Sequence, residues 1–168
     1  KMDEIVNKVK GLDVITIDVK DFYTQGTREK FNVSDFLEDG VLIEKTFRKK
    51  LMDFDWQVYS KKFVYVIIDK NLIIPSWAFL LLSYYLNKYS SDYVIGNIRS
   101  LEEKLYNISL NNLDLNSLKD KKVIVKGCSD IPFIGYVYSE LTRRLSKVVK
   151  SLMYGEPCSR VPIFRNSN

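Results

Sequence analysis

The sequence predicts an α/β fold, with a three-layer α-β-α arrangement around one mostly parallel sheet. After residue 60, short apolar runs of strand length alternate with longer segments of helical periodicity, which is typical of consecutive β-α units. These strands are continuous apolar runs rather than alternating ones, so helices should cover both faces of the sheet. The N-terminal third is less regular, and we expect it to contribute a short strand or hairpin.

The N-terminal portion, residues 1–60, contains weaker signals. Residues 14–19 alternate apolar and polar side chains and predict a strand, while residues 41–43 predict a shorter one. Residues 23–26, between them, are typical of a turn. Residues 46–59 then predict a helix whose apolar side carries Phe47, Leu51, Phe54 and Val58.

Residues 61–153 predict three β-α units in series. The strands are expected at residues 63–68, 93–95 and 123–125. Each strand is followed by a helix, at residues 76–89, 101–110 and 133–153. Residues 154–168 contain two prolines and predict an extended C-terminal tail.

Composition predicts one ordinary globular domain that covers residues 1–168. The chain is 46% hydrophobic and has 168 residues, which is enough to bury a core without a metal or disulfide. No apolar run reaches the roughly 18 residues that a membrane helix needs, and no secretion signal is recognisable. We therefore expect a soluble cytoplasmic protein that does not bind membranes.

The absence of histidine restricts the chemistry. It removes the usual general base and every Ser-His or Cys-His catalytic arrangement. The sequence also lacks Gly-x-Gly-x-x-Gly, Walker and Gly-x-Ser-x-Gly motifs, which argues against nucleotide-binding enzymes and hydrolases. These patterns assign no catalytic residue and leave open whether the chain catalyses a reaction.

The two cysteines, Cys128 and Cys158, stand in turn-like settings. Cys128 follows a strand that should end near Lys126, at the sheet edge where α/β proteins gather their ligands. A helix should begin soon after it, with Ser129 or Asp130 as the cap. The helix N-terminus and Lys126 both favour a thiolate, whereas the negative charge of Asp130 opposes one. Cys128 and Cys158 are therefore candidate metal ligands or persulfide acceptors, and the alternative is that both thiols merely pack.

The spacing of the two cysteines favours pairing between chains. A helix over residues 133–153 would span roughly 30 Å and carry Cys158 to the opposite end of the sheet. A homodimer is suggested separately by residues 75–86, a helical segment without any charge that is either buried in the fold or covered by a second copy. Two chains would supply four thiols, the number that a zinc or iron-sulfur site uses.

Basic residues are concentrated at the C-terminal end. Residues 121–168 hold nine lysines and arginines against three acidic residues. The last predicted helix places a row of cations on one face, and together with a tail residue these form a candidate surface for an anion or acidic partner: Arg143, Arg144, Lys147, Lys150 and Arg160. The alternative is a solvated face on which Glu140 pairs with Arg144. No nucleic-acid-binding motif accompanies the charge, so we expect no nucleic-acid binding.

Several segments of the chain resemble a known family. They are residues 126–132 (Lys-Gly-Cys-Ser-Asp-Ile-Pro), residues 151–163, Ile74-Pro75-Ser76-Trp77-Ala78, residues 18–23 and Asp55-Trp56. Over nearly its whole length the chain resembles a bacterial family, domain of unknown function 2480. The association of that family with Bacteroidetes and with gene neighbourhoods for SUF-type iron-sulfur cluster assembly implies a thiol role and assembly proteins as partners. The resemblance carries over no catalytic residue.

Two functions follow from these patterns. The first is an accessory protein in iron-sulfur cluster assembly or sulfur metabolism, which uses Cys128 and Cys158 as ligands or persulfide carriers and binds an iron-sulfur cluster or zinc. The alternative is a non-enzymatic protein-interaction module with a basic C-terminal helix and structural cysteines.

Overall fold

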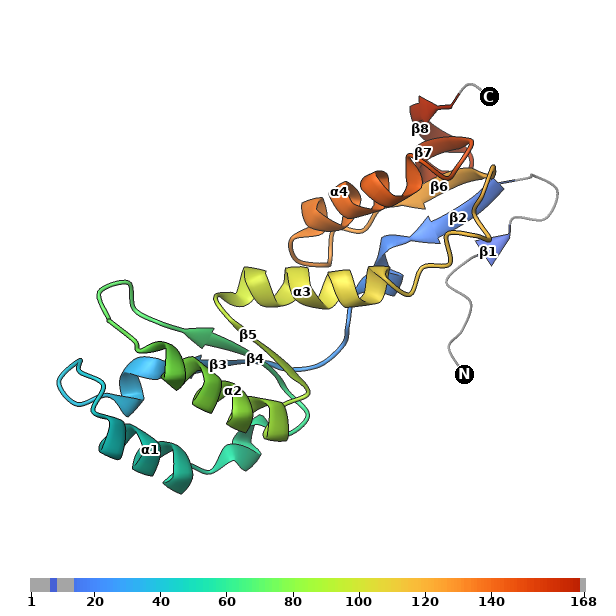
Figure 1. Ribbon diagram of the computed structural model, residues 1–168. Helices are drawn as coiled ribbons and strands as arrows, with labels where there is room; N and C mark the ends of the chain where they lie inside the picture. Colours follow the sequence, from blue (N-terminus) through green and yellow to red (C-terminus); the bar gives the residue numbers. More distant parts are fainter. Residues whose placement is uncertain (1–6, 9–13, 167–168) are drawn as a thin grey trace. The chain divides into compact units, whose positions relative to one another are not determined.

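The computed structural model describes residues 7–8 and 14–166 (Figure 1). The predicted α/β class with mostly parallel strands is confirmed, with four α-helices in the described residues. The strands form two sheets rather than the single sheet expected. The chain divides accordingly into two compact units, Lys1–Thr24 with Leu105–Asn168 (unit 1) and Gln25–Lys104 (unit 2). The expectation of one domain over residues 1–168 stays a prediction.

Unit 1 contains a five-stranded sheet in the order β1-β2-β6-β7-β8. Its strands are β1 (Asn7–Lys8), β2 (Val14–Asp18), β6 (Lys122–Lys126), β7 (Ser151–Glu156) and β8 (Ser159–Arg165). The three central strands are parallel, while β1 and β8 pair antiparallel at the two edges. A short 3-10 helix, η1 (Val19–Phe22), follows β2.

The core of unit 1 lies on one face of this sheet. Val123 and Val125 of β6 point into it, together with Val137 and Leu141 of helix α4 (Ile134–Leu145). The part of helix α3 (Ile98–Leu110) that belongs to unit 1 adds further buried residues. Because side chains alternate between faces along a strand, Lys122 lies on the face opposite this core.

Unit 2 contains a three-stranded parallel sheet in the order β3-β4-β5. Its elements are β3 (Arg28–Asn32), η2 (Val33–Phe36), α1 (Glu44–Asp53), η3 (Trp56–Tyr59), β4 (Phe63–Ile67), α2 (Ser76–Tyr89) and β5 (Asp92–Ile95). The core is aromatic. The ring of Trp56 stacks on Phe31 at 5.6 Å and on Tyr85 at 4.9 Å, and its indole N–H donates to the Leu51 carbonyl at 2.7 Å.

A buried ion pair joins β3 to the start of α3 within unit 2. Arg28 Nε lies 2.6 Å from Glu102 Oε1, and Arg28 Nη2 lies 3.1 Å from Glu102 Oε2. Only 3% of the Glu102 side chain is exposed, and among the described residues Glu102 is the one charged residue in the buried class. The two-pronged geometry compensates for taking both charges out of water.

Most predicted elements are confirmed, including the strands at β2, β4, β5 and β6 and the helices at α2 and α3. The helix expected over residues 46–59 is split, because α1 ends at Asp53 and η3 begins at Trp56. Val58 therefore leaves the predicted apolar side and is exposed. Residues 41–43 form no strand beyond an isolated bridge between Glu38 and Val41. Residues 23–26 lie outside any helix or strand, as expected of a turn.

The helix predicted over residues 133–153 is wrong beyond Leu145. There α4 ends, and the predicted tail becomes the β7–β8 hairpin. Two features stabilise this ending. The Asn166 side-chain amide donates to the carbonyls of Ser146 and Val149, both at 2.9 Å, and β7 gains a parallel ladder with β6. No helix in the part of the chain that the structure describes has the length and apolarity to cross a membrane.

Candidate functional site

The carboxyl edge of the unit 1 sheet is the first candidate site. The parallel strands β2, β6 and β7 end there, and Asp18 pairs in register with Lys126. In α/β sheets this is the edge where loops and helix N-termini gather ligands. The loop from β6 to α4 occupies it, and its last residue, Phe133, adopts the left-handed region with φ 53°. A bulky residue in that region is a conformational outlier.

Cys128 lies in this loop as predicted, with a free thiol that is half-buried against the core of unit 1. Its Sγ accepts the backbone N–H of Asp130 at 3.3 Å. The Ser129 hydroxyl donates to the Asp130 carboxylate at 2.9 Å. The N-cap of α4 is Phe133, without a side-chain cap bond, so Ser129 and Asp130 do not have the predicted capping role. Both residues shape the loop around the thiol instead.

Lys126 points its charge at a carboxylate. Its Nζ lies 3.1 Å from Glu156 Oε1, at the end of β7, and this hydrogen bond raises the pKa of Lys126 above its usual value. Across the same edge, Lys20 Nζ lies 4.0 Å from Asp130. The predicted support of a Cys128 thiolate by Lys126 stays a prediction.

Two tyrosines that sequence reasoning missed lie beside the Cys128 loop. The rings of Tyr138 on α4 and Tyr154 on β7 meet edge to face at 5.7 Å, with their hydroxyls 3.5 Å apart. Burial, together with the hydrogen bond to Tyr154, raises the pKa of Tyr138 to about 12. Gly127 is the one sequence signal that could have found them, because a Cβ at this position would lie 2.1 Å from the Tyr154 hydroxyl.

Cys158 occupies the turn between β7 and β8 and is exposed. The expectation that a long helix carries it to the far end of the sheet is wrong, because β7 runs parallel to β6 and brings Glu156 beside Lys126. The loop with Cys128 and the turn with Cys158 therefore leave the same edge of the sheet. Over residues 7–8 and 14–166, the structure forms no group of three or more Cys, Asp or Glu side chains placed to hold a metal ion.

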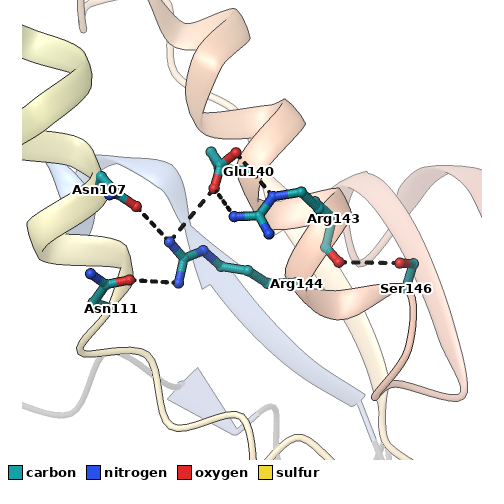
Figure 2. A network of polar contacts seen from close by, with 6 residues as sticks. All are labelled: Asn107, Asn111, Glu140, Arg143, Arg144 and Ser146. Carbon is teal, nitrogen blue, oxygen red and sulfur yellow. Dashed lines mark hydrogen bonds and ion pairs between the residues drawn. The ribbon is translucent and has the colours of Figure 1, made fainter.

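The predicted basic row on the last helix is also wrong. Lys147 and Lys150 lie beyond the end of α4, and the two arginines on α4 are engaged with neighbours (Figure 2). Arg143 binds Glu140 through two nitrogens, at 3.1 and 2.6 Å, and this hydrogen bonding lowers the pKa of Glu140. Arg144 lies 3.6 Å from the same carboxylate, so the alternative of Glu140 paired with Arg144 is supported.

Arg144 is a structural residue of unit 1. Figure 2 shows its guanidinium between α4 and the last turns of α3, where it donates to the side-chain oxygens of Asn107 at 2.7 Å and Asn111 at 2.8 Å. Only 15% of its side chain is exposed. Arg144 therefore ties two helices of one unit together rather than facing a partner.

A basic groove, the second candidate site, lies on the face of the unit 1 sheet opposite its core. It has a volume of about 470 Å³. Four cations line it together with six uncharged residues: Lys122, Lys150, Arg160 and Arg165, with Val14, Ser151, Met153, Pro162, Ile163 and Phe164. No described carboxylate lines it, and no described residue forms an ion pair with any of the four cations.

The sequence predicts two of the four cations in the basic groove, Lys150 and Arg160, as anion-binding residues. It does not single out the other two, Lys122 and Arg165. The strand register brings these two together, because Ser151 pairs with Lys122 on one side and with Arg165 on the other. The missing signal was strand β8, in which Arg160, Pro162 and Arg165 reach the groove.

Unit 2 has a larger pocket, of about 610 Å³, between β3, α1 and the aromatic core. It mixes lysines with carboxylates, since Lys30 and Lys49 share it with Asp35 and Asp53. A third lysine, Lys50, donates to the Leu37 carbonyl at 2.8 Å. The opposing charges give this pocket no clear preference for the sign of a ligand.

Comparison with known proteins gives one match. The model of a family described as "Protein of unknown function (DUF2480)" matches residues 3–166, nearly the whole chain. No curated protein and no solved structure matches.

Proposed function

The chain belongs to the DUF2480 family, and we propose that it is a non-enzymatic interaction module that binds an anionic partner through unit 1. The observation that carries this proposal is the basic groove. Lys122, Lys150, Arg160 and Arg165 surround an aliphatic floor, with no described acid among them. The four like charges lie within roughly two Debye lengths of one another and therefore repel each other. A bound anion relieves that repulsion.

The test is binding of a fluorescent polyglutamate peptide, measured by anisotropy as salt is raised. Lys122→Gln/Arg165→Gln should weaken binding by about tenfold, the equivalent of about 1.4 kcal/mol. Affinity should also fall as salt is added, because the groove lies at the surface. The matched control, Lys45→Gln/Lys119→Gln, removes the same net charge from exposed positions outside the groove. Equal losses in the two double variants, or no binding at low salt, would sink the proposal.

A second candidate function is the use of both cysteines in iron-sulfur cluster assembly or sulfur metabolism. The observation in its favour is that the Cys128 loop and the Cys158 turn leave the same sheet edge. The half-buried Cys128 would act as acceptor or ligand, and the exposed Cys158 would offer a second thiolate at that edge, with zinc or an iron-sulfur cluster as the bound group. As a persulfide carrier, the Cys128 thiolate would attack the outer sulfur of a donor persulfide, and the donor would leave as a thiolate.

Differential alkylation tests this second candidate. Cys128 should react with iodoacetamide at pH 7 faster than the more exposed Cys158, because this candidate function requires Cys128 to be the more nucleophilic of the two thiols. Mass spectrometry of each cysteine gives both rates in one experiment. The candidate fails if Cys128 reacts only after unfolding and if Cys128→Ser costs about 1 to 3 kcal/mol, the signature of a core thiol replaced by a hydroxyl.

A further inference from the structure

We infer that the partner of the basic groove is an extended polypeptide segment that combines acidic and aliphatic side chains. This inference rests on the proposed function and specifies the chemistry of the partner. It follows from the spacing of the cations, from the aliphatic residues between them and from the features of the edge strand β8.

The cations are spread too widely for one small anion. Arg165 and Lys122 lie on β8 and β6, two strand spacings apart, which places their Cα atoms about 10 Å from each other. Arg160 and Arg165 are at the two ends of β8, roughly 17 Å apart along the strand. A single phosphate or carboxylate can contact only some of these cations at once. Several anionic groups on one extended chain match the distances between them.

The floor between the cations is aliphatic. Met153, Pro162 and Ile163 line it, and Ile163 is 51% exposed in the described structure. Covering this surface with aliphatic side chains adds about 25 cal/mol for each Å² removed from water, a gain that charge alone does not provide. The partner therefore needs apolar residues between its acids.

The same floor argues against nucleic acid. Single-stranded nucleic acids bind proteins by stacking bases on exposed aromatic rings along a basic groove. The one aromatic residue that lines this groove in the described part of the chain is Phe164, which is half-buried and packs against the core of unit 1. The groove has cations that can contact a phosphate backbone. Among the described residues that line it, there is no exposed aromatic ring on which bases can stack.

The partner docks on the sheet face rather than adding a strand to the edge. β8 is the edge strand, and Pro162 in its middle has no N–H to donate. The pairing of β7 with β8 also shifts register between Leu152 and Met153. Prolines, cations and irregular pairing are features that protect an edge against strand addition.

The experiment compares three fluorescent probes of similar length at about 0.15 M salt. They are a peptide of about ten residues that alternates Glu and Leu, long enough to cross the groove, the same peptide with Ser in place of Leu, and oligo-dT. The Glu/Leu peptide should bind the intact chain about tenfold more tightly than the Glu/Ser peptide. Ile163→Ser should remove that preference, because it takes away an exposed aliphatic side chain of the floor. Val161→Ser is the matched control, because Val161 is 59% exposed on the same strand but does not line the groove.

The outcomes separate this inference from the proposed function. If the two peptides bind equally, the partner is not apolar and the inference is overturned, while the anion-binding module stands. Tighter binding of oligo-dT than of either peptide also overturns the inference and leaves the module intact. If none of the three probes binds at about 0.15 M salt, and none binds when the salt is lowered, both the inference and the proposed function fail.

Discussion

Units 1 and 2 differ in whether their charged residues are paired with residues of opposite charge. Unit 2 buries an Arg28–Glu102 pair, and its large pocket sets lysines against aspartates. Unit 1 has the smaller groove, but that groove is lined by cations and by no described acid. Pocket volume and charge pattern therefore single out different candidate sites. An uncompensated cluster of like charges is the more specific signal, because proteins normally pair such charges with opposite ones or disperse them over the surface.

The interiors of the two units differ as well, and this difference provides separate probes. Both tryptophans, Trp56 and Trp77, belong to unit 2, where Trp56 stacks among other rings. Both cysteines belong to unit 1. Tryptophan fluorescence therefore reports the unfolding of unit 2, and an environment-sensitive label on the exposed Cys158 reports the unfolding of unit 1.

The largest effect on stability should come from Glu102→Ala. This substitution leaves Arg28 largely buried without its carboxylate, which costs about 3 kcal/mol in the free energy of unfolding. Denaturant unfolding followed by tryptophan fluorescence measures the loss. The control, Glu44→Ala, removes the exposed i,i+4 pair with Arg48 in the same unit and should cost less than about 1 kcal/mol. Similar losses for the two variants would contradict the special role of the buried pair.

The same variant tests whether residues 1–168 form one domain. If they do, Glu102→Ala shifts the tryptophan transition of unit 2 and the Cys158-label transition of unit 1 by the same amount, because two-state unfolding gives coincident transitions. A shift confined to tryptophan fluorescence would show that the units unfold separately.

A smaller effect should appear at high pH, with one tyrosine in each unit. Burial raises the pKa of Tyr59 in unit 2 to about 12, with Glu29 and Asp35 adding to the shift, and the pKa of Tyr138 in unit 1 is also about 12. An ordinary tyrosine has a pKa near 10. Because folding favours the neutral phenol, each contribution is complete below about pH 10 and is lost as the pH rises through about 12, by roughly 2 kcal/mol for Tyr59.

Tyr59→Phe and Tyr138→Phe isolate these two terms. Each variant should lose less stability between about pH 9.5 and 12 than the unmodified chain, measured as the free energy of unfolding in urea. Lysines that titrate in the same range are common to all three proteins and cancel in the comparison. A pH dependence identical to that of the unmodified chain would show that the substituted tyrosine ionises normally.

The sequence predicted the helices and strands that have a clear apolar periodicity. The strand β6 and the position of Cys128 after it are examples, because a run such as Lys122–Lys126 has few other interpretations. Strand β3 was missed because Arg28–Asn32 contains a single apolar residue, Phe31, and becomes a strand by pairing with β4. Tertiary pairing overrides a weak local signal.

The C-terminal error has a similar cause. Val148 and Leu152 continue the helical spacing of Leu145, so the local pattern favours a longer helix. The parallel ladder with β6 and the amide of Asn166 are remote in sequence, and together they select a strand. The basic groove depends on that strand, so its four cations could not be assembled from sequence spacing alone.

A third prediction concerns packing at the carboxyl edge of unit 1. Gly127→Ala should cost about 1 to 2 kcal/mol, because its Cβ would lie 2.1 Å from the Tyr154 hydroxyl and 2.9 Å from that of Tyr138. Gly135→Ala is the matched control in α4, where a Cβ meets nothing within 4 Å and alanine should stabilise the helix by up to about 1 kcal/mol. Denaturation of both variants should therefore give shifts of opposite sign. A Gly127→Ala variant that loses no stability would mean that the two tyrosines move aside without cost.

The smallest effect on stability, and the test of the expected homodimer, should come from Leu80→Lys in unit 2. Helix α2 buries Ala78, Leu82 and Leu86 and exposes Leu80 by 75% and Tyr84 by 62%, so the described residues leave an apolar part of this helix uncovered. If a second copy covers it in a contact of at least about 1,200 Å² in total, light scattering should give a dimer at micromolar concentration and a monomer for Leu80→Lys.

Unfolding of the monomeric Leu80→Lys chain should change by no more than about 0.5 kcal/mol apart from the lost association, because the side chain contributes little to the core of unit 2. Met52→Lys is the control, since Met52 is also exposed in unit 2 but lies on α1, and it should remain dimeric. A monomeric unmodified chain would refute the homodimer and leave α2 as an uncovered apolar face. The basic groove of unit 1 would then be the better-supported contact surface, because its charges specify a partner whereas an apolar face does not.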